Sequence, residues 1–391
     1  MQQTRGFVVV MAMSTLLLGA TAAQARDAVP FDADAKVAYS LGGATVQCGD
    51  TLTQHTKLTR DLNCPGTLPY ALRVTGAGVV LDLGGYTVRR AGPEVIGSQG
   101  IVLEADSMVR NGTIQGFGFG LVTRLNALYV RLHKLTILDN GGGVYNQGAT
   151  NFLITECRVS GNGQGLTREF DAATGSFDVR SSVFTHNELA MIADYHSIDV
   201  LDSTFTSNGN VVFCWEGSVR FRSSTIAWNA SVSTIPNDGD GPRVCGQMRF
   251  ENTLIANNTA FAPPAVPVWE PLRLSMIDSL AVNNGSSLQA AAETVYIDGN
   301  TFYDNAGGLI LSDRPGPFTV PLTGIVRGNQ FLANDSDGLR VLAPSTPTVI
   351  SNVALGNTGF GIYAPTAFDG GGNVARDNGA GDCVGILCAP Y

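Results

Sequence analysis

The apolar and polar residues of this chain alternate in short runs that recur along most of its length. Ile198 and Val200, for example, alternate with polar neighbours. Val219 and Phe221 repeat this spacing further along the chain. Alternation with a period of two is typical of β-strands that bury one face. Gly, Asn, Ser and Asp separate the runs, and helical spacing is absent beyond the N-terminal segment. The pattern therefore predicts many short strands joined by tight corners.

Within this pattern an asparagine returns every 21 to 29 residues, with an apolar residue three positions before it. The recurrent residues are Asn140, Asn162, Asn187, Asn208, Asn229, Asn257, Asn283, Asn305, Asn334, Asn357 and Asn378. A repeat of this length built from strands favours a parallel β-helix, in which neighbouring coils complete one another's core. We expect an all-β solenoid of about 12–13 coils, spaced about 4.8 Å apart.

The recurrent asparagines are expected to have a structural role. Asn tolerates left-handed backbone dihedrals at a corner, and stacked Asn side chains can hydrogen-bond to one another as a ladder. The apolar residues three positions earlier should then fill the core. We expect Phe184, Phe205, Phe302 and Phe331 to be buried in a stacked column.

Three segments near the start of the repeat carry a family resemblance. They are Cys-Gly-Asp-Thr-Leu at 48–52, Asp-Leu-Asn-Cys-Pro-Gly at 61–66 and Leu-Asp-Leu-Gly-Gly-Tyr-Thr-Val at 81–88. With the repeat that follows, they resemble the first coils of bacterial secreted proteins of the pectate-lyase-like superfamily. The resemblance covers nearly all of the mature chain and implies a right-handed parallel β-helix. It implies no single activity, because that group holds lyases, hydrolases, epimerases, adhesins and inert stalks.

The first 25 residues have the features of a signal peptide. Arg5 supplies the positive start, residues 7–18 are apolar, and Ala23 and Ala25 form a small-x-small cleavage pattern. A membrane anchor is the alternative, but the apolar run is shorter than the about 18 residues that a span needs. We therefore expect a cleaved signal peptide at 1–25, a single β-helix domain at 26–391, and a secreted or periplasmic protein.

The charge of the chain narrows the range of partners. It has 24 basic and 33 acidic residues and a net charge of −9. Binding to nucleic acid needs a basic face, which this composition does not supply. A polyanionic substrate is disfavoured as well, unless a cation or a local cluster of arginines offsets the field.

Seven cysteines in an exported chain predict three disulfides and one free thiol. The predicted pairs are Cys48–Cys64, Cys214–Cys245 and Cys383–Cys388. The first and last pairs would close the two ends of the solenoid. Cys214 and Cys245 fall on one face, one coil apart, once an insertion at 231–242 is set aside, and the coil spacing suits a disulfide. Cys157 stands five positions before a recurrent Asn, which predicts a buried free thiol.

Long gaps between recurrent asparagines locate loops, at 231–242, 261–271 and 312–320. The first two should leave the same corner on neighbouring coils and stand over one sheet. Asp238 and Asp240 in the first loop have part of the spacing of a Ca²⁺ site. Ca²⁺ is the one cofactor that any pattern in the sequence suggests.

The strand that follows the recurrent Asn collects unlike polar side chains on adjacent coils. The catalytic candidates are Glu169, Asp194 and His196, because paired carboxylates suit acid–base chemistry at a glycosidic bond. The candidates for binding substrate are Arg168, Asp171, Tyr195, Trp215, Glu216 and Trp269. The simpler interpretation is a solvated strand face that has no site.

No catalytic signature of the superfamily is complete in this chain. Polygalacturonases carry adjacent aspartates and an Arg-Ile-Lys motif, and pectate lyases carry Trp-Ile-Asp-His, and all of these are absent. Mannuronan epimerases carry Asp-Pro-His, which Asp194-Tyr195-His196 resembles without the Pro. The sequence thus favours an exported β-helix that binds polysaccharide or acts as a surface spacer. The alternative is a lyase, epimerase or hydrolase that uses Glu169, Asp194 and His196.

Overall fold

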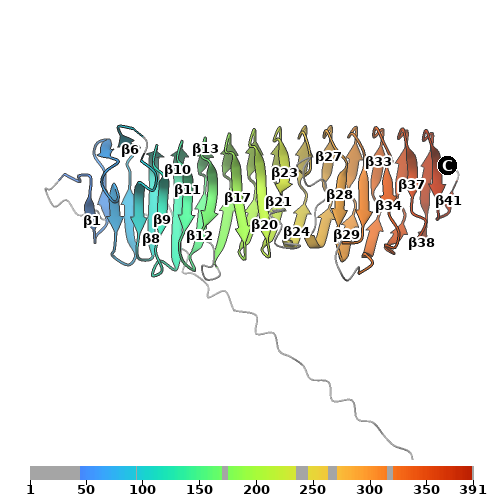
Figure 1. The fold of residues 1–391 in the computed structure, drawn as a ribbon, viewed down its shortest axis with the longest axis horizontal. Coiled ribbons are helices and arrows are strands. Elements are labelled where there is room, and N and C mark those ends of the chain that lie inside the picture. Colours follow the sequence, from blue (N-terminus) through green and yellow to red (C-terminus); the bar gives the residue numbers. More distant parts are fainter. Residues whose placement is uncertain are drawn as a thin grey trace, which may run out of the picture. The chain divides into compact units, whose positions relative to one another are not determined.

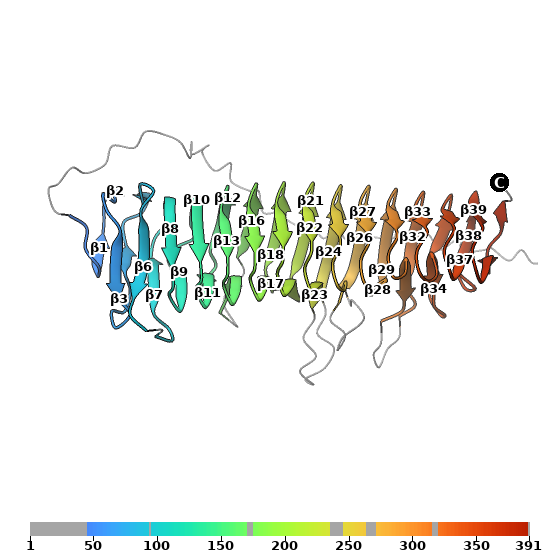
Figure 2. The same ribbon diagram turned by 90° about the horizontal axis from the view of Figure 1, so that it is seen from above.

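The computed structural model describes residues 45–93, 95–169, 175–234, 245–262, 271–314 and 320–389. The expected signal peptide and the candidates Asp171, Asp238, Asp240 and Trp269 lie outside these ranges. The described elements are β-strands, and every named strand pairs in parallel with its neighbours. Figure 1 shows them stacked in chain order from β1 to β41, and Figure 2 shows the same order in the perpendicular view. The fold is a parallel β-solenoid of about 13 turns, as the repeat predicts.

The strands of successive coils build three faces. The first face begins with a nine-stranded sheet of β1 (Asp50–Leu52), β4 (Leu72–Val74), β7 (Gln99–Leu103), β9 (Phe119–Thr123), β11 (Gly142–Asn146), β14 (Gln164–Arg168), β17 (Leu189–Asp194), β20 (Asn210–Trp215) and β23 (Ser231–Thr234). It ends with a five-stranded sheet of β28 (Leu288–Ala291), β31 (Leu309–Ser312), β34 (Leu339–Val341), β37 (Phe360–Tyr363) and β40 (Gly381–Val384).

The other two faces are joined by two long strands, β8 (Ser107–Gln115) and β10 (Tyr129–Leu138), which run through both. The second face also contains β2 (Thr56–Lys57), β5 (Val79–Asp82), β12 (Asn151–Thr155), β15 (Ser176–Arg180), β18 (Ser197–Leu201), β21 (Ser218–Arg222), β24 (Cys245–Glu251), β26 (Pro271–Ile277), β29 (Thr294–Asp298), β32 (Thr323–Arg327), β35 (Thr348–Ile350) and β38 (Phe368–Gly371). The third face also contains β3 (Leu62–Pro65), β6 (Thr87–Ala91), β13 (Arg158–Ser160), β16 (Val183–Thr185), β19 (Thr204–Thr206), β22 (Thr225–Ala227), β25 (Leu254–Ala256), β27 (Leu280–Val282), β30 (Thr301–Tyr303), β33 (Gln330–Leu332), β36 (Val353–Leu355), β39 (Asn373–Arg376) and β41 (Cys388–Ala389).

The core behind the third face contains the predicted aromatic column. The Phe184 and Phe205 rings stack with their centroids 4.8 Å apart, and those of Phe302 and Phe331 stack at 5.1 Å. All four side chains are buried. In-register pairing of the short strands places these residues directly above one another, so each ring completes the packing of the next coil.

An Asn ladder runs along the corner between the third and first faces. At each coil the Nδ2 of one Asn donates to the Oδ1 of the next, as from Asn140 to Asn162 and from Asn187 to Asn208, both at 3.0 Å. The members of the ladder are Asn140, Asn162, Asn187, Asn208, Asn229, Asn258, Asn284, Asn305, Asn334, Asn357 and Asn378. The predicted ladder is confirmed, with two corrections.

Both corrections concern the residue that precedes the ladder position. The predicted members Asn257 and Asn283 are wrong by one residue, because Asn258 and Asn284 make the ladder bonds. Asn257 and Asn283 instead have left-handed dihedrals, with φ of 56° and 51°. Ser207 likewise has φ of 56° just before Asn208. The left-handed corner and the ladder are therefore adjacent positions and not one residue, since the turn at the first directs the second inward.

A second ladder, the Ser/Asn ladder, runs along the corner between the second and third faces. Its members are Cys157, Ser182, Ser203, Ser224, Thr253, Ser279, Asn300, Asn329, Asn352 and Asn373. Backbone N–H groups donate to the side-chain oxygen of the next coil, as from Ser182 to Ser203 Oγ at 3.1 Å. Cys157 starts this ladder as the predicted buried free thiol. Burial raises the pKa of its thiol to about 12, so it is a poor nucleophile at neutral pH.

The three predicted disulfides are present, with Cα separations of 5.4 Å for Cys48–Cys64, 5.1 Å for Cys214–Cys245 and 6.1 Å for Cys383–Cys388. Such bonds persist in oxidising environments, which indicates an extracellular or periplasmic setting. Among the described residues no helix has the length and apolar character of a membrane span.

The loop at 231–242 begins later than predicted. Ser231–Thr234 continue the first face as β23, because Asn210 and Val212 of β20 pair with them in register. Phe261, predicted to start the second loop, is buried in the core, and Ser233 N–H donates to its carbonyl oxygen. The remaining loop residues at 235–244, 263–270 and 315–319 lie outside the described ranges.

Candidate functional site

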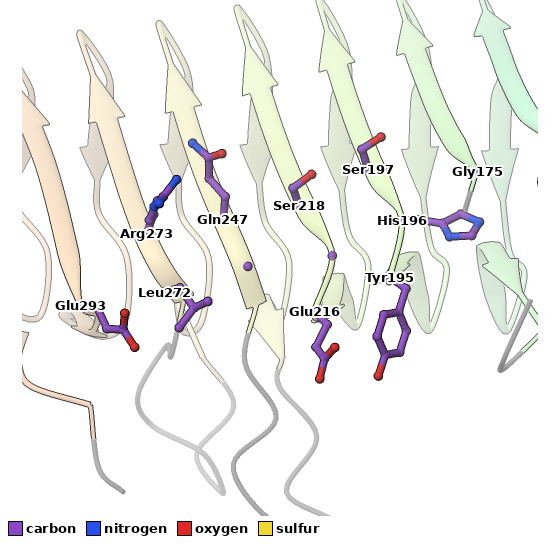
Figure 3. A pocket seen from close by; sticks show the side chains of 12 residues that line it. Gly175, Tyr195, His196, Ser197, Glu216, Ser218, Gln247, Leu272, Arg273 and Glu293 are labelled. Carbon is purple, nitrogen blue, oxygen red and sulfur yellow. The ribbon is translucent and has the colours of Figure 1, made fainter. Parts of the chain in front are cut away.

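An open groove follows the corner between the first and second faces, with a volume of about 530 Å³. It crosses the coils that contain β18, β21, β24 and β26. The turns after β17 and β20 form one side, and the first residues of the second-face strands form the other. Figure 3 shows its side chains in a row that extends from coil to coil. A groove that follows the stacking direction offers related positions to a ligand at each coil.

The second-face side of the groove is a column of polar side chains. Strand pairing places Ser197, Ser218, Gln247 and Arg273 directly above one another. These residues come just before the apolar residues Ile198, Val219, Met248 and Leu274, which point into the core. The alternation of the strands therefore directs the column to solvent, with a spacing of about 4.8 Å between neighbours.

An exposed aromatic residue, Tyr195, lines one end of the groove, and Trp215 of the first face lies beside it. Tyr195 follows β17 and is 44% exposed, and its ring lies 5.8 Å from that of Trp215, the last residue of β20. Tyr195 has a left-handed φ of 53°, and Glu216, one coil further on, has a φ of 49°. Figure 3 shows the Tyr195 and Glu216 side chains extending from neighbouring coils in a similar direction. The aromatic end of the groove thus carries an exposed carboxylate beside it.

The groove has charged groups of both signs. Glu216 and Arg273 are exposed, and at the far end Glu293 accepts from Arg314 Nη1 at 3.1 Å. The groove therefore has no strong field of one sign. This balance suits a ligand that carries little net charge.

Beneath the aromatic end lies a buried cluster, Arg168, Asp194 and His196, which we call the clamp. Arg168 Nη1 donates to His196 Nδ1 at 2.8 Å, and Arg168 Nε lies 3.6 Å from Asp194 Oδ2. The side chain of Asn146 lies 3.1 Å from His196 Nε2. All four residues are at least 95% buried. The clamp thus belongs to the interior, and His196 alone among its members also borders the groove.

The chemistry of His196 is set by this burial. Burial first, and the positive charge of Arg168 second, lower the pKa of His196 to about 4. The imidazole is therefore neutral at pH 7. Because a guanidinium only donates hydrogen bonds, Nδ1 must carry the lone pair, and that lone pair is occupied by Arg168. His196 is held as a structural acceptor more than as a free base.

The structure brings most of the predicted site residues together. Arg168, Asp194 and His196 form the clamp, Tyr195 and Glu216 line the end of the groove above it, and the Trp215 ring lies beside that of Tyr195. Glu169 does not join them. It is exposed just after the last residue of β14, where Arg168 turns inward and the next side chain points out. Burial and the nearby Glu169 carboxylate raise the pKa of Tyr145, which places Glu169 over the first face.

Several groove residues were missed by reasoning from the sequence. Ser197, Ser218, Gln247, Arg273 and Glu293 line the groove but precede or follow the positions that the recurrent Asn frame singled out. A signal for two of them was present, because Ser197 and Ser218 stand immediately before the alternating apolar residues of successive strands. Within the described ranges no group of three or more His, Cys, Asp or Glu residues could hold a metal ion.

Comparison with known proteins identifies the family. Residues 192–387, half of the chain, match the model described as "Right handed beta helix region", so the chain belongs to that family. No curated protein sequence matches it. Its structure is similar to the A-modules of two Azotobacter vinelandii mannuronan C-5 epimerases. For AlgE4 the identity is 16% and the TM-score 0.45, over 83% of this chain and 91% of that one. For AlgE6 the values are 13% and 0.44, over 88% and 91%.

Proposed function

We propose that this member of the right-handed β-helix family is an exported protein that binds a polysaccharide chain of low net charge along the groove. The observation that carries the proposal is the polar column of Ser197, Ser218, Gln247 and Arg273, which extends from the aromatic end. A column that repeats with the coils suits a polymer that repeats along its length. The hydroxyl and amide groups supply donors and acceptors for sugar hydroxyls.

The aromatic end supports the same ligand. A half-exposed Tyr195 ring beside Trp215 offers an apolar surface on which the face of a sugar ring can lie. Binding sites for small ligands generally combine such surfaces with a few placed polar groups. The carboxylate of Glu216 supplies an acceptor next to the ring.

The alternative of catalysis by Glu169, Asp194 and His196 has less support. Glu169 is exposed whereas Asp194 is buried, so these two carboxylates do not both face the groove. Asp194 and His196 are both 1% exposed. A general acid or base must come within hydrogen-bond reach of the reacting group, and the lone pair of His196 is occupied by Arg168.

The test is retention by immobilised polysaccharide. The mature protein would be run through native gels that contain dextran, galactomannan or mixed-linkage β-glucan, beside the variant Tyr195→Ala. We expect one of these polymers to slow the wild type, and the variant to bind about fivefold to tenfold more weakly. The matched control is Tyr303→Ala, since Tyr303 on β30 of the third face is 46% exposed and distant from the groove.

Two results would count against the proposal. The first is that none of the polymers slows the wild type. The second is that Tyr195→Ala and Tyr303→Ala bind as well as each other. Mass spectrometry of the polymer after incubation separates binding from turnover, because shortened or unsaturated chains would favour the enzymatic alternative.

A further inference from the structure

The clamp contains an ion pair that is expensive to bury. The Arg168 and Asp194 side chains are 1% and 2% exposed. Removing such charges from water carries a large desolvation penalty, so a buried pair by itself is weak evidence for stability. Ion pairs on the solvent side of the second face, such as Arg222–Asp199, are partly exposed and avoid most of this penalty. What sets this buried pair apart is its position directly beneath the groove, next to Tyr195.

The contacts of Arg168 indicate what that role is. The guanidinium reaches three consecutive residues of the corner above it. It lies 3.6 Å from Asp194 Oδ2, donates to His196 Nδ1 at 2.8 Å, and has its Cζ 5.8 Å from the centre of the Tyr195 ring. A cation at that distance from the ring is attracted to the π-system. One side chain thus holds both neighbours of Tyr195 and Tyr195 itself.

The backbone shows why Tyr195 needs such support. Its φ of 53° is left-handed, a conformation that is unfavourable for a residue other than Gly. Asp194 and His196 are buried on either side of it, so the Tyr195 ring is directed out toward the groove. Glu216 has a similar φ of 49° on the next coil, so the turn itself is common to the corner, and the contacts of Arg168 are what distinguish Tyr195.

We infer that Arg168 is a positioning residue, which anchors Asp194 and His196 and thereby presents the Tyr195 ring to a sugar at the end of the groove. As far as it concerns a sugar, this inference rests on the proposed function. The orientation of the ring in the free protein does not depend on any ligand. Preorganisation of this kind strengthens binding by removing the entropy cost of ordering the ring.

A second buried ion pair supplies the matched control. Arg110 Nε lies 3.3 Å from Asp82 Oδ2, and the two side chains are 8% and 6% exposed. This pair is on β8 and β5 of the second face, and β10 and β12 separate it from the first coil of the groove. Replacing either pair by uncharged side chains should have a similar effect on global stability. Only the pair in the clamp should change the groove.

The first measurement needs no ligand. In a background with Trp228→Phe and Trp269→Phe, Trp215 is the one tryptophan left, and its ring lies 5.8 Å from that of Tyr195. We expect the double substitution Arg168→Met with Asp194→Asn to increase acrylamide quenching of Trp215 in the folded protein. Arg110→Met with Asp82→Asn should leave quenching at the level of the background.

The second measurement is polysaccharide affinity in the otherwise natural chain. With a polymer that slows the wild type in native gels, the clamp variant should bind about tenfold more weakly and the control variant should bind normally. If no polymer is retained, the proposed function fails, and the quenching comparison still decides the role of Arg168. Equal quenching in the clamp and control variants would overturn the inference.

A third variant covers the case in which the double substitution does not fold. Arg168→Lys keeps a positive charge near Asp194 but loses the planar fork that reaches His196 and the ring. We expect this variant to fold, to show more quenching of Trp215 than the background, and to bind more weakly. If quenching matched that of the single-tryptophan background and affinity matched that of the wild type, a positive charge alone would be sufficient, and Arg168 would have no positioning role.

Discussion

The two ladder corners and the groove corner are built in opposite ways. Along the Asn ladder every coil repeats one interaction, with Nδ2···Oδ1 distances of about 3.0 Å from Asn140 to Asn378. At the groove corner neighbouring coils differ. Two neighbouring coils are joined there by the hydrogen bond between Arg168 and His196, whereas the following coils are joined by the Cys214–Cys245 disulfide. The uniform corners supply the stacking, which leaves the third corner free to vary.

This difference has an energetic basis. Each Asn side chain in a ladder satisfies buried backbone groups that any coil would expose at a sharp turn, so the same residue is the solution every time. Asn208 Nδ2, for example, donates to Phe184 O and Asn229 Oδ1. At the groove corner no single side-chain interaction of this kind repeats from coil to coil. Its residues therefore differ from coil to coil.

The largest effect should come from the core behind the ladders. Phe205→Ala should lower the free energy of unfolding by about 3–5 kcal/mol, because the ring is fully buried and stacks between coils. Urea unfolding followed by circular dichroism measures this. Phe213→Ala is the control, since Phe213 on β20 is only half-buried and should cost less. Equal losses for the two variants would contradict the uniform core that the repeat requires.

The next prediction concerns the disulfide that stabilises the groove corner. Removing the Cys214–Cys245 disulfide with Cys214→Ala and Cys245→Ala should cost about 3–4 kcal/mol, because it closes a loop of 31 residues. Cys383 and Cys388 are 5 residues apart, and their removal should cost about 2 kcal/mol. Urea midpoints of the two double variants give the comparison. A larger loss at the C-terminal pair would mean that the groove corner does not need its disulfide.

A smaller effect separates the middle of a ladder from its end. Asn208→Ala leaves buried partners on two coils unsatisfied and should cost about 1–3 kcal/mol. Asn378 lies in the last coil and is half-buried, so water can replace its contacts and Asn378→Ala should cost less. Urea unfolding of both variants decides this. If the terminal variant lost as much as the central one, water would not be replacing the lost contacts at the end of the ladder, and the prediction would be wrong.

The same contrast explains what the sequence could predict. The Asn ladder and the buried apolar position of the third-face strands recur from coil to coil, so Asn208 and Phe205 were identifiable from spacing alone. The Cys214–Cys245 disulfide is confirmed, but the predicted common face is wrong, because Cys214 lies on β20 of the first face and Cys245 begins β24 of the second. The frame shift at Asn257 and Asn283 arose because two adjacent asparagines fit one pattern, and only the backbone turn distinguishes them.

The candidate site was only partly predictable for a related physical reason. Counting from the ladder placed Asp194, His196 and Trp215 near one another. It did not reveal that Arg168 turns inward and Glu169 outward, because the direction of a side chain at the end of a strand depends on its turn. Gln247 and Arg273 were missed because no repeated residue type marks their column, although strand pairing aligns them.

The smallest expected effect is a pH dependence of the free energy of unfolding that arises at the groove corner and not in the ladders. The pKa of His196 is about 4 in the folded protein and about 6.5 in an unfolded chain. Between these values the unfolded state binds more protons, so the free energy of unfolding falls as the pH drops from about 6.5 to about 4. The amides of the Asn ladder do not titrate in this window. We expect His196→Gln to flatten this slope when urea midpoints are compared at pH about 7 and about 4.5. His186→Gln, an exposed position beside the Asn ladder, should retain the wild-type slope. Equal slopes in all three proteins would show that the interior of the groove corner tolerates a charged imidazole, and that the clamp is looser than its contacts indicate.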